Sequence, residues 1–162
     1  MALNVSGIWD ALAGVEDPEL PVAITDLGLV RSVTVEGAHV RVQLVPTFTG
    51  CPALDVIRER VRGRLLGLPG VETAEVVFTY EEPWTLDRLT ETARVRLADH
   101  GLSVPRASLA EPAVCPFCGS TNTVIENPFG ATLCRAIYYC RDCRNPIERF
   151  KPPGDPTPAP KG

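Results

Sequence analysis

The chain has 162 residues, which is room for one ordinary domain and a small second one rather than for two large domains. Hydrophobic residues make up 44% of it, as in ordinary globular proteins, so disorder of the whole chain is excluded. The formal net charge of −4 argues against wholesale binding to nucleic acid or to an anionic membrane.

The first third of the chain predicts a helix, a loop and two strands. Apolar residues at helical spacing follow Asn4 and Ser6, and either of these polar residues can cap a short first helix. Residues 17–29 contain two prolines, which do not fit a helix interior, and therefore predict an ordered loop. Residues 30–35 and 40–45 alternate in the manner of strands and are joined by a short turn.

A second helix is predicted to begin after Cys51 and Pro52. Its apolar stripe consists of Ala53, Val56, Ile57, Val61, Leu65 and Leu68. Residues 71–80 predict a third strand, and residues 86–100 predict a third helix that ends at Gly101. This order of elements predicts an α+β fold in which helices pack on a small three-stranded sheet.

Two CxxC pairs separated by 21 residues follow in the C-terminal part: Cys115 with Cys118, and Cys140 with Cys143. Each pair predicts a tight knuckle that places two sulfurs on one side, and two knuckles supply the tetrahedral thiolate set that zinc prefers. A unit of about 40 residues is also at the size where a metal or disulfides are usually needed. The pattern therefore predicts a zinc ribbon. An iron–sulfur cluster on the same thiolates, or disulfides, remain alternatives.

The composition along the chain predicts four parts. Residues 1–102 form the first domain, and residues 103–113 lack periodicity and are interpreted as a linker. Residues 114–151 form the ribbon, and residues 152–162 are a proline-rich tail that is predicted to be disordered.

Cys134 lies six residues before Cys140, which is too far for it to belong to a knuckle. One interpretation is a small, buried apolar residue. The other is a spare thiolate near the metal, which would bind a cofactor by accepting iron or sulfide.

Cys51 is predicted at the N-cap of the second helix, because the following Pro52 favours the first helical position. At an N-cap, helix N–H groups and the helix dipole stabilise a thiolate and lower its pKa. The groups predicted to support it are Thr47, Asp17, Glu19 and Asp26. A cysteine that merely packs is the alternative. A Cys–His hydrolase is disfavoured, because no histidine motif lies near Cys51.

Several segments resemble known proteins. The first domain resembles the domain shared by SufT-type and cytosolic iron–sulfur assembly proteins, through Asp17-Pro18-Glu19-Leu20-Pro21, Asp26-Leu27-Gly28 and Gly50-Cys51-Pro52. With the ribbon, the whole chain is similar to the PaaD family, through Phe129-Gly130, Cys134-Arg135-Ala136 and the ending Phe150-Lys151-Pro152. PaaD proteins are small subunits encoded with the phenylacetyl-CoA oxygenase, or epoxidase.

The resemblance implies an accessory role in aerobic phenylacetate degradation, namely the assembly of an iron–sulfur cluster or of iron in the oxygenase complex. It implies that Cys51 is the reactive or cluster-transfer thiolate, that zinc fills the ribbon, and that iron or a cluster is bound transiently. The implied partners are the oxygenase catalytic subunits and their [2Fe–2S] flavin reductase. A catalytic role is disfavoured, because a di-iron site in a helix bundle uses Glu-x-x-His pairs on its helices, whereas the one such spacing here, Glu36 to His39, lies in the predicted turn. Whether the chain forms a homodimer is left open.

Two other functions remain as hypotheses. The chain could be a non-catalytic structural subunit of the oxygenase, with an inert Cys51. It could also be a ribbon that binds single-stranded nucleic acid through interleaved cations and aromatic rings. Those residues are Arg135, Arg141, Arg144, Arg149, Lys151, Tyr138, Tyr139 and Phe150. The lack of a signal peptide or of a long apolar run predicts a cytoplasmic protein.

Overall fold

The computed structural model describes residues 3–48, 50–106 and 111–151. The chain forms two compact units, Met1–Trp84 and Thr85–Gly162. This division differs from the predicted boundary at residue 102, because the third helix belongs to the same unit as the ribbon. The predicted disordered tail, residues 152–162, lies outside the described residues.

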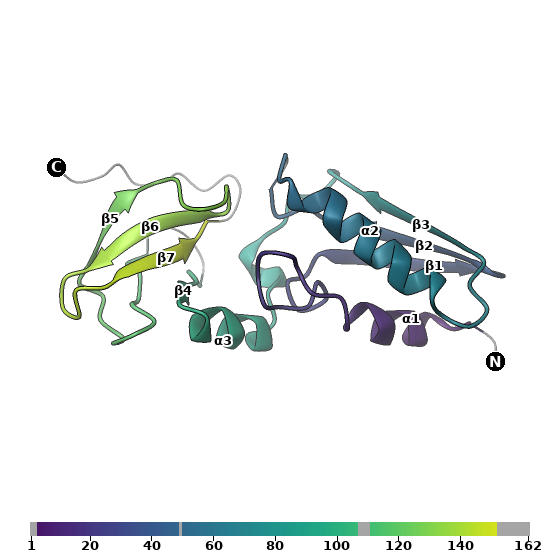
Figure 1. Ribbon diagram of the computed structural model, residues 1–162, viewed down its shortest axis with the longest axis horizontal. Helices are drawn as coiled ribbons and strands as arrows, with labels where there is room; N and C mark the ends of the chain where they lie inside the picture. Colours follow the sequence, from purple (N-terminus) through teal and green to yellow (C-terminus); the bar gives the residue numbers. More distant parts are fainter. Residues whose placement is uncertain (1–2, 49, 107–110, 152–162) are drawn as a thin grey trace. The chain divides into compact units, whose positions relative to one another are not determined.

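The first unit has a three-stranded sheet with helices on one face (Figure 1). In chain order its elements are α1 Val5–Leu12, β1 Val30–Glu36, β2 His39–Leu44, α2 Ala53–Leu66 and β3 Thr73–Phe78. The strand order is β1-β2-β3. A short turn joins β1 and β2 as an antiparallel pair, whereas α2 crosses over and makes β3 parallel to β2. The predicted cap of α1 is confirmed, because the Asn4 side chain accepts a hydrogen bond of 2.6 Å from the Gly7 amide.

The core of this unit lies between the sheet and the two helices. α1 contacts β1, α2 contacts β3, and the helices contact each other, so both cover the same face. On β2, the residues that point to this face are fully buried: Val40, Val42 and Leu44. On α2, the buried residues are Ala53, Ile57, Val61 and Leu65. Val56 was predicted to join this stripe and is instead 43% exposed, because it falls outside the arc that the other four share at about 100° per residue.

The second unit contains a four-stranded sheet of order β4-β7-β6-β5. Its elements are the 3-10 turn η1 Leu86–Arg88, α3 Glu91–Asp99, β4 Leu102–Ser103, β5 Thr123–Asn127, β6 Arg135–Cys140 and β7 Pro146–Phe150. The predicted third helix is thus split, because Thr90 has extended backbone and caps α3 by accepting a hydrogen bond from the Ala93 amide.

The predicted fold class is confirmed: an α+β unit is followed by a four-cysteine ribbon. Strands β4 and β7 were not predicted, because two-residue β4 is too short to show alternation and β7 begins at a proline. Among the described residues, none of the helices has both the length and the apolar character needed to cross a bilayer.

Candidate functional site

Four cysteine sulfurs of the second unit form one cluster. The Sγ atoms of Cys115, Cys118, Cys140 and Cys143 all lie within 4.8 Å of one another. Two of the distances, from Cys115 to Cys143 and from Cys118 to Cys140, are 3.6 Å. A tetrahedral site with metal–sulfur bonds of about 2.3 Å has sulfur–sulfur edges of about 3.8 Å, so the cluster fits a four-thiolate metal ion. The disulfide alternative is wrong, since the six cysteines are not joined to one another.

The two knuckles share one backbone pattern. In each, the carbonyl of the first cysteine accepts a hydrogen bond from the amide four residues later: Gly119 to Cys115 at 2.8 Å and Arg144 to Cys140 at 2.9 Å. The donor residue has a positive φ in both cases, +75° for Gly119 and +60° for Arg144. The first knuckle therefore uses the residue that tolerates this conformation, while the second imposes it on an arginine.

Asp142 ties the two knuckles together. Its carboxylate accepts hydrogen bonds from the Ser120 hydroxyl and, at 2.7 Å, from the Asn122 side chain. These two hydrogen bonds, that from Ser120 foremost, lower the pKa of Asp142. These bonds connect the second knuckle to the residues that follow the first, so they help to fix the position of one pair of sulfurs relative to the other.

Thiols this close together cannot all be ionised without a cation. The Ser120 backbone lowers the pKa of Cys118, but desolvation and the other three cysteines outweigh it and raise that pKa to about 12. At Cys143, a hydrogen bond from the Asn145 side chain is the largest of the effects that lower the pKa to about 6. A metal ion that binds here therefore has to displace protons from the cluster.

Cys134 is not part of the four-cysteine cluster. It lies just before β6, its side chain is 7% exposed, and its sulfur is 3.1 Å from the Thr132 hydroxyl. Its carbonyl accepts a hydrogen bond of 2.6 Å from the Lys151 amide, which continues the pairing of β6 with β7. A role for Cys134 in cofactor binding stays a prediction.

Cys51 lies just ahead of α2 and is half-buried. The chain turns here through Gly50, whose φ of +83° is one that other residues rarely adopt. Pro52, rather than Cys51, occupies the N-cap, so the predicted cap position is wrong by one residue. The sulfur is nevertheless close to the start of the helix, because the backbone of Ala53 forms a hydrogen bond with it.

The predicted lowering of the Cys51 pKa is also wrong. Burial raises the pKa of the thiol, and the negative charges of Glu19 and Asp17 raise it further. The hydrogen bond from Ala53 acts in the opposite direction and does not compensate. Cys51 is thus a mainly protonated thiol at neutral pH.

The loop before β1 brings two of the predicted carboxylates to Cys51. Asp17 shapes this loop, because its Oδ1 accepts hydrogen bonds from the amides of Glu19 at 2.8 Å and Leu20 at 3.0 Å. Asp17 and Glu19 are close enough for their charges to act on the thiol. Asp26 and Thr47 are half-buried, and their support of Cys51 stays a prediction.

One supporting residue was not predicted. The indole Nε1 of Trp84 donates a hydrogen bond of 2.8 Å to the carbonyl of Leu27, and thereby fastens the loop that contains Asp26. Trp84 is 2% exposed. A tryptophan within a mainly polar segment indicates a buried anchor, but the partner of its N–H group lies 57 positions away and leaves no local signal.

The raised pKa predicts slow alkylation of Cys51. Iodoacetamide at about pH 8 is expected to modify it more slowly than an unstructured cysteine, because less thiolate is present. Glu19→Gln is expected to increase the rate, since it removes a charge that raises the pKa.

The raised pKa also fixes how Cys51 affects stability at different pH values. Because the pKa is higher in the folded chain than in the unfolded chain, the contribution of Cys51 to folding stability is complete below its ordinary pKa of 9.0. This contribution is lost as the pH rises through the higher folded value.

Peptide mass spectrometry of the metal-loaded chain measures the alkylation rate at Cys51 alone. Glu36→Gln, at the end of β1, is the matched control and should leave the rate unchanged. Equal rates for Glu19→Gln and Glu36→Gln would show that the carboxylate is not a cause of the raised pKa.

Comparison with known proteins bears on both units. Residues 6–76 match the family model of an iron–sulfur cluster assembly protein, and residues 102–151 match that of the PaaD zinc beta ribbon domain. The chain is 39% identical over 154 residues to a putative 1,2-phenylacetyl-CoA epoxidase subunit of Escherichia coli (strain K12), and the match covers 91% of this chain and 93% of that protein. The chain belongs to the PaaD family. The predicted resemblance is thereby confirmed over both units of this PaaD-family chain.

The first unit also has relatives without a ribbon. The Fe-S protein maturation auxiliary factor YitW of Bacillus subtilis (strain 168) is 37% identical over 91 residues, which are 56% of this chain and 89% of that protein. A crystal structure of a domain of unknown function, DUF59, from Bacillus anthracis matches with a TM-score of 0.54 and 33% identity. The match covers 57% of this PaaD-family chain and 89% of that domain. The three-stranded sheet with its two helices is therefore a fold that this chain shares with that DUF59 domain.

Proposed function

We propose that this PaaD-family chain assists the assembly of an iron–sulfur cluster, or of iron, in the phenylacetyl-CoA oxygenase of aerobic phenylacetate degradation. One observation carries the proposal: a single chain joins a unit similar to Fe-S maturation factors with a PaaD ribbon, and its relative over almost the whole length is named an epoxidase subunit. The oxygenase catalytic subunits and their [2Fe–2S] flavin reductase are the partners we propose.

Within this function the two groups of cysteines have different tasks. The ribbon cluster is complete, and zinc is the ion we propose for it, as a structural site. Among the described residues, the ribbon cysteines are the sole group of three or more side chains with ligand atoms close enough to hold an ion together. Cys51 therefore offers the cargo its thiolate and at most one nearby carboxylate, that of Asp17 or Glu19, and the remaining ligands come from the donor or the client. Such an incomplete site suits transfer, because the cargo can leave it.

The test is the metal content of the client. In cells that produce this chain with the flavin reductase, Cys51→Ala is expected to reduce the iron and acid-labile sulfide of the purified reductase several-fold, because the only thiol proposed to carry the cargo is gone. Glu36→Gln, an exposed substitution at the end of β1, is the control, and Cys134→Ala tests separately the predicted role of that cysteine in cofactor binding. Unchanged iron and sulfide with Cys51→Ala would refute the transfer role.

A structural subunit of the oxygenase is the second candidate, and it is favoured by the name of the Escherichia coli relative. It predicts stable co-purification with the catalytic subunits and no effect of Cys51→Ala on the metal content of any partner. The two functions are thus separated by the same variant, measured in the same cells.

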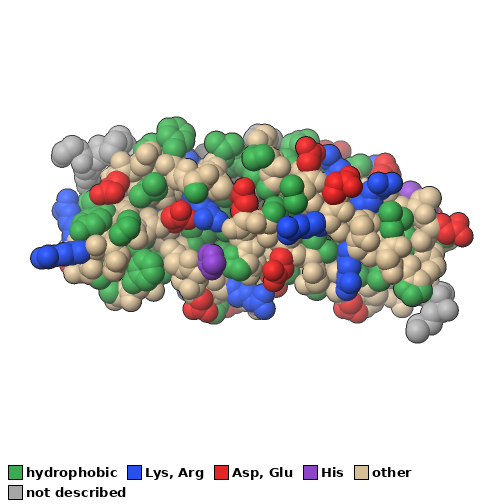
Figure 2. All heavy atoms as spheres, viewed as in Figure 1, with side chains coloured by type: hydrophobic (Ala, Val, Ile, Leu, Met, Phe, Trp, Pro, Cys, Tyr) green, Lys and Arg blue, Asp and Glu red, His purple; other side chains and the backbone are tan. Residues whose placement is uncertain are grey.

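A nucleic-acid function loses support from the positions of the side chains. Arg149, Lys151 and Phe150 are all buried, at 1%, 7% and 0% exposure, so they are not available to stack on bases or pair with phosphates. Arg135 forms an ion pair of 2.6 Å with Glu148. On the face shown in Figure 2, cationic and anionic side chains are interspersed rather than gathered by sign.

A further inference from the structure

Three segments of the ribbon that the proposed function does not use meet at one place. They are Phe129-Gly130 in the loop between β5 and β6, Cys134-Arg135 at the start of β6, and Phe150-Lys151 at the end of β7. The pairing of β6 with β7 brings them together, and it continues to the Lys151 amide, which donates a hydrogen bond of 2.6 Å to the Cys134 carbonyl. The metal ligand Cys140 lies at the other end of β6, about 20 Å away along the strand.

Cys134 and Lys151 lie opposite each other on the buried face of this sheet. Burial alternates along β6 from Cys134 onward, so the cysteine shares its face with Ala136 and Tyr138. Residues directly opposite in an antiparallel pair point to the same face, with Cβ atoms about 4.5–5.5 Å apart. Both side chains are 7% exposed. A thiol and an ammonium group are therefore neighbours within the ribbon, away from the metal cluster.

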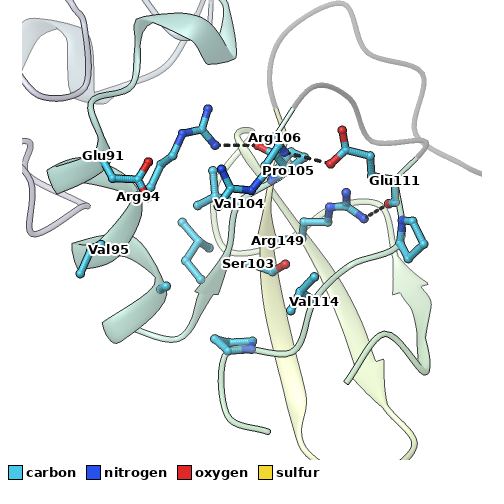
Figure 3. A pocket seen from close by; sticks show the side chains of 14 residues that line it. Glu91, Arg94, Val95, Ser103, Val104, Pro105, Arg106, Glu111, Val114 and Arg149 are labelled. Atoms are coloured by element: carbon cyan, nitrogen blue, oxygen red, sulfur yellow. Dashed lines mark hydrogen bonds between the residues drawn. The ribbon is translucent and has the colours of Figure 1, made fainter. Parts of the chain in front are cut away.

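Two buried cations on this face each fasten a segment that lies outside the strands. Arg149, which pairs with Ala136, donates a hydrogen bond of 2.7 Å to the carbonyl of Glu111 (Figure 3). Lys151 fastens the β5–β6 loop, residues 128–133. Its Nζ donates a hydrogen bond of 2.6 Å to the Pro128 carbonyl and lies 5.0 Å from the centre of the Phe129 ring, within the range of a cation–π contact. The ammonium group therefore ties this loop to the strand end that faces Cys134.

The β5–β6 loop lies close to the thiol. The Thr132 hydroxyl is 3.1 Å from the Cys134 sulfur. The Gly130 amide donates a hydrogen bond of 2.8 Å to the Arg135 carbonyl. A Cβ atom at residue 130 would lie 3.0 Å from the Arg135 side chain and 3.1 Å from its backbone, so a larger residue would push the loop away from β6. The loop thus contributes to the burial of the Cys134 sulfur.

The large apolar side chains of the loop do little to hold it in this position. Phe129 is 66% exposed and Leu133 is 43% exposed, so neither gains much free energy from burial. A segment with few buried apolar contacts opens at a lower cost in free energy than the rest of its fold. The contacts of Lys151 therefore matter for closure, and the loop can open while the strands stay paired.

We propose that Lys151 and Phe129 form a latch that holds the β5–β6 loop closed over Cys134 and controls access to its thiol. While the latch is closed, the sulfur is shielded from reagents in solution. Opening takes Pro128 and Phe129 away from the ammonium group and leaves the thiol beside a cation, which favours the reactive thiolate. Cys134 is thus a gated nucleophile for soft electrophiles. This inference does not rest on the proposed function, because it involves neither Cys51 nor the metal content of a partner.

The rate at which N-ethylmaleimide alkylates Cys134 in the full-length, metal-loaded chain tests the proposal. The thiolate sulfur adds to the double bond of the maleimide and the neighbouring carbon takes a proton from water, so peptide mass spectrometry detects the added reagent at this cysteine. Phe129→Ala removes part of the latch at an exposed position and is expected to raise the rate by about tenfold, because the open loop is more populated. Phe117→Ala is the matched control, since this phenylalanine of the first knuckle is 59% exposed and lies outside the latch.

A second variant separates a latch from a simple effect of charge. Lys151→Met is expected to speed alkylation if the lysine holds the loop, and to slow it if the lysine acts only by stabilising the thiolate. Retention of the metal shows that the ribbon of each variant is folded, and the Phe129→Ala comparison decides alone if Lys151→Met loses its metal. The proposal is overturned if Cys134 reacts as fast in the unaltered chain as in urea, if Phe129→Ala reacts no faster than Phe117→Ala, or if metal-loaded Lys151→Met reacts more slowly than the unaltered chain.

Discussion

Removal of the metal is expected to unfold the ribbon and to leave the first unit folded. The apolar core of the ribbon is small, and two of its six buried members are cysteines of the metal cluster: Ala113, Cys115, Ala136, Tyr138, Cys140 and Ile147. A structural zinc ion in such a module supplies roughly 10–16 kcal/mol, which exceeds what this core can provide. The first unit has its own core of strands and helices and contains none of the four ligands.

Hydrogen exchange measured by mass spectrometry, with and without a strong chelator, resolves the two units in one sample. Chelation is expected to abolish protection in β5, β6 and β7 while β2 keeps it. Cys140→Ser should reproduce the effect without chelator, whereas Cys134→Ser, outside the cluster, should retain the metal. Protection of β6 that survives both chelation and Cys140→Ser would show that the ribbon does not depend on a metal for its fold.

The same experiment is sensitive to pH in a known direction. The Cys143 pKa of about 6 lies below that of an ordinary thiol, whereas the Cys118 pKa of about 12 lies above it. Metal binding must release the remaining protons, so acidification favours the metal-free, unfolded ribbon. The metal affinity of the ribbon, measured in competition with a chelator whose own affinity is known at each pH, is therefore expected to fall as the pH is lowered.

The spacing of residues in the sequence was sufficient to predict the ribbon site. Cys115, Cys118, Cys140 and Cys143 are found together because each CxxC pair is a local turn, and only the meeting of two such turns needs the fold. The sheet and helices of the first unit were predictable for a similar reason, since alternation and helical spacing are local patterns.

The chemistry of Cys51 could not be predicted in the same way. Helix position alone predicted a lowered pKa, but the thiol is governed by burial and by charges from a loop more than 30 residues earlier in the chain. The approach of Asp17 and Glu19 was predicted, but the degree of burial, which is the largest cause of the raised pKa, depends on the packed fold and leaves no local signal. Both β4 and β7 were missed because their strand character comes from pairing partners rather than from their own residues.

Substitution of Trp84 by alanine is expected to destabilise the first unit by about 3–5 kcal/mol. The side chain is among the largest that are fully enclosed in the chain, so its removal leaves a cavity. It also leaves the carbonyl of Leu27 without the indole N–H that now satisfies it, and an unsatisfied buried group costs about 1–3 kcal/mol.

The ion pairs of the segment before Trp84 are too exposed to replace the indole hydrogen bond. Arg31 forms ion pairs with Glu81 at 3.0 Å and Glu82 at 2.7 Å, but the glutamates are 75% and 42% exposed. Exposed pairs contribute about 0–1 kcal/mol each, because solvent screens them and both side chains lose freedom. The indole N–H group, by contrast, forms a buried hydrogen bond with the loop that carries Asp26.

Trp9 on α1, which is 36% exposed, is the control within the same chain. Trp9→Ala is expected to lower the free energy of unfolding by well under about 2 kcal/mol. Hydrogen exchange of the buried β2 amides measures the stability of the first unit without reliance on tryptophan fluorescence. Because Trp84 fastens the Asp26 loop, Trp84→Ala should also increase exchange at residues 26–29 more than elsewhere. If Trp84→Ala and Trp9→Ala lowered β2 protection equally, the indole would be an ordinary surface contact and the loop would owe its position to something else.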